Sequence, residues 1–114
     1  MPTPDELAMD VHDLWFAANS CRDMGAAHTT ASTSVTSCNP ASAFTRPEGI
    51  GYGPTGIYDE WAALRDQILS MLTTNASSLQ DTATAMDLCV DININANDSV
   101  KAEFEKRKAE IPYE

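Results

Sequence analysis

The feature that most constrains the fold is a long run of apolar residues with helical spacing between residues 56 and 93. At 100° per residue, its large apolar side chains fall within one stripe roughly 100° wide. The stripe comprises Ile57, Trp61, Leu64, Ile68, Met71, Leu72, Leu79, Met86, Cys89 and Val90. The pattern predicts one long amphipathic helix, and we expect the first third of the chain to cover part of the stripe and another polypeptide to cover the rest.

A second helix is predicted at the N-terminus. Thr3 is a suitable N-cap, Pro4 suits the first turn, and Glu6 stands three residues after Thr3, as in a capping box. Leu7, Val11, Leu14, Ala18, Cys21 and Gly25 follow at heptad spacing. Because Thr and Ser lower helix propensity, we expect this helix to cover about residues 4–34 and to end between Thr29 and Cys38.

Residues 39–55 are rich in Gly and Pro, which excludes regular structure and allows the chain to reverse. The fold class is therefore all-α, an antiparallel two-helix hairpin over residues 1–100 with a long Gly/Pro loop. Residues 92–97 alternate apolar and polar side chains, and since a lone strand is unstable, they are interpreted as a frayed or kinked helix end. Residues 101–114 form a polar tail, in which Ser99–Ile111 is predicted to be a polar helix that Pro112 ends. Because this helix has no apolar stripe, we expect it to be ordered only on binding.

The hairpin leaves large apolar side chains without a place in its seam. The predicted seam consists of Leu7, Val11, Leu14, Trp61, Leu64, Ile68, Leu79 and Met86. Met9 and Phe16 lie on the far side of the first helix, with Trp15 at its edge. Scattered apolar surface residues are normal in soluble proteins, but in a chain this short of core they also indicate a second contact surface. We therefore expect a homo- or heterodimer that completes a four-helix bundle, with a partner interface of Met9, Trp15, Phe16, Leu69 and Leu72.

The net charge of −10 argues against several partners. Residues 1–100 carry thirteen acidic side chains and three arginines, whereas the tail is balanced. Nucleic acids and anionic membrane surfaces require clusters of Lys and Arg. No apolar run approaches the ~20 residues that span a bilayer, and the N-terminus lacks a basic region followed by an apolar core. We expect neither nucleic-acid binding, nor membrane insertion, nor export by the general secretory route.

The sequence predicts no catalytic, cofactor or metal site. His12 and His28 are sixteen residues apart on one predicted helix, a separation of roughly 24 Å. Cys21, His28 and Cys38 would meet only if the chain folded back, and they lack the CxxC spacing typical of zinc sites. Cys21 and Cys89 are expected to act as small buried apolar residues. Whether any two of the three cysteines are bridged stays open.

The order of features resembles the small helical-hairpin proteins of the bacterial type VII (ESX) secretion system, the Trp-x-Gly family and especially its EspC-like relatives. The resemblance spans roughly residues 5–100. It rests on Gly51-Tyr52-Gly53-Pro54 at the turn, on Tyr58, Trp61 and Leu64, on Asn75-Ala76 through Leu79, on Asp81-Thr82-Ala83 and Met86, and on Asp98. The Trp-x-Gly motif itself is absent, because Ala62 and Ala63 follow Trp61.

The resemblance implies a non-enzymatic substrate or targeting partner that is exported without a cleaved signal peptide, as a dimer with another helical hairpin or with the N-terminal helices of a larger effector. Many relatives carry a Tyr-x-x-x-Asp/Glu export signal after the second helix. Ile94 and Asp98 occupy the matching positions here, with Ile in place of Tyr. The alternative hypothesis is a cytoplasmic, acidic helical adaptor or immunity-type protein that binds a basic partner and is not exported.

Overall fold

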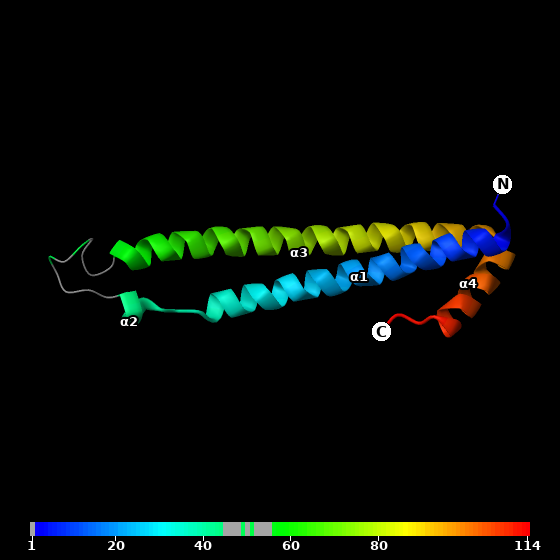
Figure 1. Cartoon of the computed structure of the whole chain (residues 1–114). Helices are drawn as coiled ribbons and strands as arrows, with labels where there is room; N and C mark the ends of the chain where they lie inside the picture. Colours follow the sequence, from blue (N-terminus) through cyan, green and yellow to red (C-terminus); the bar gives the residue numbers. More distant parts are fainter. Residues whose placement is uncertain (1, 45–48, 50, 52–55) are drawn as a thin grey trace. The chain divides into compact units, whose positions relative to one another are not determined.

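The computed structural model describes residues 2–44, 49, 51 and 56–114. Its helices are α1 (Pro4–Ser37), α2 (Ala41–Phe44), α3 (Gly56–Ala96) and α4 (Asp98–Glu110) (Figure 1). Over these residues the structure has no strand, so the predicted all-α class is confirmed. About half of the predicted 39–55 loop lies outside the described residues. The expectation that this range has no regular structure is wrong at Ala41–Phe44, because α2 is one turn of helix. This turn forms because Pro40 O accepts hydrogen bonds from Ala43 N (2.9 Å) and Phe44 N (3.2 Å).

The chain divides into two compact units, each described here by itself. The terminal unit consists of Met1–Gly25 and Ser77–Glu114, and the middle unit of Ala26–Ala76. Helices α1 and α3 each contribute to both units, α2 belongs to the middle unit, and α4 belongs to the terminal unit.

The start of α1 follows from its capping box, as predicted. Thr3 Oγ1 accepts a hydrogen bond from Glu6 N at 3.1 Å, and Glu6 Oε2 accepts one from Thr3 N at 2.9 Å. The helix ends at Ser37, three residues beyond the expected 34. In this Ser/Thr-rich stretch, hydroxyls donate to carbonyls four residues earlier, as Thr36 does to Ser32 O at 2.8 Å. The side chains therefore bond within the helix instead of competing with it.

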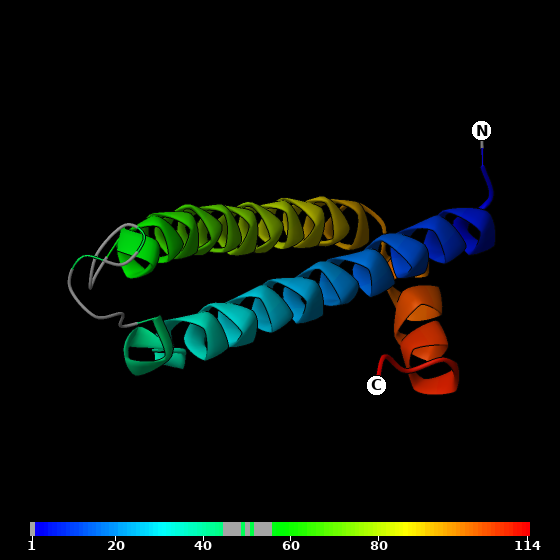
Figure 2. The ribbon, with the colours of Figure 1, turned by 60° about the vertical axis from the view of Figure 1, so that its left-hand side comes forward.

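Helices α3 and α4 are separated by Asn97, which has an extended backbone (φ −153°, ψ 114°). Its side-chain oxygen accepts hydrogen bonds from Ser99 N at 2.9 Å and Val100 N at 3.2 Å, so Asn97 is the N-cap of α4. Figure 2 shows α4, in orange and red, following α3 after this break. The region predicted as a frayed or kinked helix end is thus a regular helix to Ala96 with a defined break.

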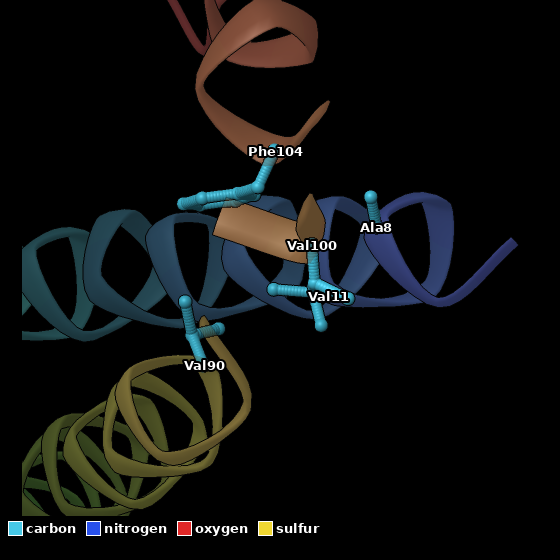
Figure 3. Close-up of a cluster of buried hydrophobic side chains, with 5 residues drawn as sticks. All are labelled: Ala8, Val11, Val90, Val100 and Phe104. Atoms are coloured by element: carbon cyan, nitrogen blue, oxygen red, sulfur yellow. The ribbon is translucent and has the colours of Figure 1, made fainter. Parts of the chain in front are cut away.

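The core of the terminal unit is formed by three helix segments. It contains Ala8 and Val11 from α1, Val90 from α3, and Val100 and Phe104 from α4 (Figure 3). Val100 and Phe104 are the largest fully buried side chains. Burial of one such side chain contributes roughly 1.5–3 kcal/mol.

The predicted polar helix of Ser99–Ile111 corresponds to α4, but it has an apolar contact that the sequence analysis did not predict. Val100 and Phe104 are four residues apart and lie on one side of the helix, where they enter the core. Two apolar side chains are too few to form a stripe in the sequence, yet they are enough to anchor three turns of helix.

Polar contacts give the direction of α1 relative to α3 in the terminal unit. Val11 of α1 and Val90 of α3 lie in the same core. Farther along α1, the Arg22 side chain pairs with Asp87. The backbone carbonyl of Arg22 accepts a hydrogen bond from Gln80 Nε2 at 3.4 Å. The partners on α3 thus move back along the chain as α1 advances. Within this unit the two helix segments run in opposite directions.

The middle unit buries less. Among its described residues Ala76 alone is buried. Trp61 is the centre of an aromatic group, with its ring centroid 6.1 Å from Phe44 and 5.9 Å from Tyr58, and the Arg65 guanidinium lies 5.2 Å from its ring. These contacts connect α2 to the first turns of α3.

Candidate docking surfaces

The apolar stripe of α3 has one covered edge and one exposed edge. On the covered edge, Trp61, Leu72, Leu79 and Met86 are half-buried and Val90 is buried. On the other edge, the exposed side chains are Ile57 (38%), Leu64 (55%), Ile68 (39%) and Met71 (64%). At 100° per residue these four lie within about 60° of one another. We call these four residues the open edge of α3.

The residues of the predicted hairpin seam are likewise partly covered and partly exposed. Leu7 and Leu14 pack against the core of the terminal unit, Val11 is part of it, and Leu79, Met86 and Trp61 are half-buried. Leu64 and Ile68, which the sequence placed in the seam, are exposed instead. Ile68 lies at the boundary between the two edges and Leu64 lies beyond it, so the apolar stripe is wider than the surface that this chain covers.

The residues predicted as partner interface have three different environments. Trp15 packs against the core, with its ring centroid 6.1 Å from that of Phe104 and the Lys108 ammonium 5.4 Å from its ring. Leu69 and Leu72 are half-buried in the middle unit. Met9 (44%) and Phe16 (37%) are exposed on α1. The sequence pattern does not indicate the contact of Trp15 with Phe104, because the two residues are 89 positions apart.

A groove of about 560 Å³ lies beside Met9 and Phe16 in the terminal unit. It is lined by Met9, His12, Asp13, Phe16, Ala17, Arg107 and Ile111. His12 is 5% exposed, and its Nε2 is 2.9 Å from Ile111 O. Its ring centroid is 5.4 Å from Trp15 and 6.1 Å from Phe16. No sequence pattern indicates this role, since His12 lies beside the predicted seam and its partner is a backbone atom.

Two arginines of the terminal unit form ion pairs with acidic side chains. Arg22 pairs with Asp87, and Arg107 Nη2 is 3.7 Å from Asp5 Oδ1, while Arg107 Nε is buried without a hydrogen-bond partner. The Tyr113 hydroxyl donates a hydrogen bond to the carboxylate of Asp23, and this hydrogen bond raises the pKa of Tyr113 above its usual value of 10.

The two positions that match the export signal belong to different elements. Ile94 is in α3 and packs against the core, whereas Asp98 is exposed in the first turn of α4. Asn97 separates them, so they do not form an i, i+4 pair on one continuous helix. Asp98 contributes instead a negative charge where the dipole of α4 favours it.

All three cysteines are free thiols. Cys21 is half-buried, but Cys38 and Cys89 are exposed. The expectation of a buried Cys89 is therefore wrong, because it lies on the same side of α3 as Leu64 and Met71, where no other part of the described chain covers it.

The described part of the chain contains no group of three or more His, Cys, Asp or Glu side chains arranged to hold a metal ion. Across the same residues, no helix combines the length and the apolar character needed to cross a bilayer. The features left as candidate sites are therefore the open edge of α3 and the Met9–Phe16 face of α1. Comparison of the chain with protein-family models, curated proteins and solved structures gives no match, so no family assignment accompanies this geometry.

Proposed function

We propose that this chain is a non-enzymatic type VII secretion substrate or targeting partner. It associates with another helical-hairpin protein, or with the N-terminal helices of a larger secreted effector, and together they complete a four-helix bundle. The proposal combines the resemblance of residues 5–100 to type VII helical hairpins with the exposure of apolar side chains along α3. Export follows the type VII route.

The observation that carries the proposal is the open edge of α3. Four large apolar side chains exposed on one side of a helix are unfavourable in water. Since they are 38–64% exposed, burial of each by a partner contributes only part of the roughly 1.5–3 kcal/mol that full burial of such a side chain gives. Contiguous exposed apolar surface of this kind is typical of protein–protein interaction sites. The spacing of the four residues suits a helix packed alongside α3.

The charge beside the open edge and the net charge of −10 indicate the chemistry of the partner. Glu60 is exposed and adjoins the open edge, whereas Asp59 lies on the opposite side of the helix. Arg65 lies over Trp61 and is paired with Asp66 at 3.2 Å. The charged side chain next to the open edge, among the described residues of this part of α3, is therefore acidic. A partner helix with an apolar stripe and basic flanks fits this surface better than a second copy of this acidic chain.

A pair of substitutions in α3 tests the interface. Ile68→Asp places a charge on the open edge, whereas Ser70→Asp places the same charge on the opposite, exposed side of the helix. We expect tagged Ile68→Asp protein, purified from cells that make it, to lose the helical partner that wild type and Ser70→Asp retain. Equal recovery of the partner by both variants would contradict the interface.

The second candidate function is a cytoplasmic acidic adaptor, which the net charge of −10 favours. Both candidates bind a basic helical partner, so binding alone does not separate them. Fractionation does: the type VII proposal expects the chain in the culture supernatant in a secretion-competent strain and its loss when the secretion ATPase is inactivated. A chain found only inside cells under both conditions favours the adaptor.

A further inference from the structure

The Met9–Phe16 face of α1 is apolar and lies next to the groove described above. The sequence pattern predicts that this face is a partner surface, because both side chains are on the far side of α1 from the seam. In the structure, however, Phe16 already has a neighbour. The ring of Tyr113 packs edge-to-face on it, with centroids 4.8 Å apart and ring planes at 81°.

Two polar contacts hold the C-terminal segment in this position. The Tyr113 hydroxyl donates to the carboxylate of Asp23, two turns farther along α1 than Phe16. At the other end of the segment, His12 Nε2 lies 2.9 Å from Ile111 O. Residues 111–113 are thus attached to α1 at three residues, His12, Phe16 and Asp23, spread over about three turns.

The backbone geometry explains why the segment lies against α1. Helix α4 ends at Glu110, where Ile111 N donates to Arg107 O at 2.7 Å, and Pro112 cannot continue the helix. The chain therefore leaves α4 beside the groove. Ile111 stays 51% exposed, in contrast to Phe104 at 2%. The segment can detach without opening the core, because none of its three contacts involves a core side chain.

We propose that the segment Ile111–Tyr113 is an intramolecular clasp on an interaction surface of α1. In the free protein the occupant of this surface is the chain's own C-terminus, with Tyr113 on Phe16. Release of the segment uncovers Phe16 and enlarges the apolar face beside Met9 and the groove. The open edge of α3 is a separate surface, so the clasp does not rest on the proposed function, and neither test depends on the result of the other.

The clasp is tested by hydroxyl-radical footprinting of the full-length chain, with side-chain modification read by mass spectrometry. Tyr113→Ala removes both the ring contact and the bond to Asp23, and we expect it to raise the modification rate of Phe16 about two-fold, since local release leaves the ring free. Trp15, which packs against the core, should keep its rate. Glu114→Gln is the matched control, because Glu114 is exposed directly after the segment and its substitution should leave the modification rate of Phe16 unchanged.

A second variant keeps the test decisive if Tyr113→Ala disturbs the fold. Tyr113→Phe retains the ring on Phe16 and loses only the hydroxyl, so we expect a smaller rise in Phe16 modification with unchanged helix content by circular dichroism. Phe16 rates equal to wild type in both variants would overturn the clasp. Equal rises at Trp15 and Phe16 would overturn it as well, because they would show that the segment supports the core and does not cover a separate surface.

Discussion

The terminal unit and the middle unit share the same two long helices, but they bury very different amounts of apolar surface. In the terminal unit, α4 adds Val100 and Phe104, and together with α1 and α3 they enclose a core. In the middle unit, Ala76 is the only buried residue among those described, and the open edge of α3 is exposed. In the terminal unit, α4 packs on α1 and on the covered edge of α3 at Val90, while Cys89 on the other edge stays exposed. The third helix of the terminal unit belongs to the same chain, whereas our proposal gives the middle unit a third helix from a partner.

The largest expected effect is a loss of stability in the terminal unit. Phe104→Ala removes the aromatic ring that lies 2% exposed against Trp15, and we expect it to lower the free energy of unfolding by about 3–5 kcal/mol. Urea denaturation followed by circular dichroism measures the change. Lys106→Ala, on the exposed side of the same helix, should stay close to wild type. A loss below about 1 kcal/mol for Phe104→Ala would show that α4 is not part of the core.

The next effect concerns how α4 is positioned. Asn97→Ala removes the side chain that accepts hydrogen bonds from Ser99 N and Val100 N, and we expect it to cost about 1 kcal/mol of stability. Asn97→Asp keeps an acceptor oxygen at the same place and should retain most of the stability. The same denaturation experiment compares the two. If both variants lose the same amount, the cap is not what holds the start of α4.

In the middle unit we expect a much smaller effect on stability. Leu64→Ala truncates a side chain that is 55% exposed on the open edge, and at low protein concentration it should change the free energy of unfolding by no more than about 0.5 kcal/mol. Urea denaturation beside Phe104→Ala gives a direct contrast between the two units. A cost comparable to that of Phe104→Ala would mean that this chain itself covers the open edge.

The smallest expected effect concerns the hydrogen bond of Tyr113, which attaches the C-terminal segment to the terminal unit. The hydrogen bond to Asp23 raises the pKa of Tyr113 above 10, so its neutral form is favoured in the folded protein. The hydrogen bond therefore contributes fully to the stability of the folded protein below pH 10, and this contribution is lost as the pH rises through the elevated pKa. Tyrosinate absorbance against pH, compared with Tyr113→Phe, isolates this group. A component that titrates at or below 10 would contradict the contact.

Local signals were the most reliable part of the sequence analysis. The capping box of Thr3 and Glu6 needs only neighbouring residues, and its hydrogen bonds form as predicted. Asn97 carried a similar signal, an N-cap residue followed by Asp98, but the alternation around it concealed the start of a new helix. Interactions across the chain could not be predicted in this way, since Trp15 with Phe104 and His12 with Ile111 join residues far apart in sequence.

By itself, the sequence determined that the chain is helical, where α1 begins, and that α3 carries an apolar stripe wider than one neighbouring helix covers. These properties depend on caps, spacing and propensity, which act within a few residues. Only the tertiary structure decided which edge of the stripe is covered, that α4 supplies the core with Val100 and Phe104, and that the C-terminus lies on Phe16. Those outcomes depend on which distant surfaces meet, and periodicity along one helix does not encode its neighbour.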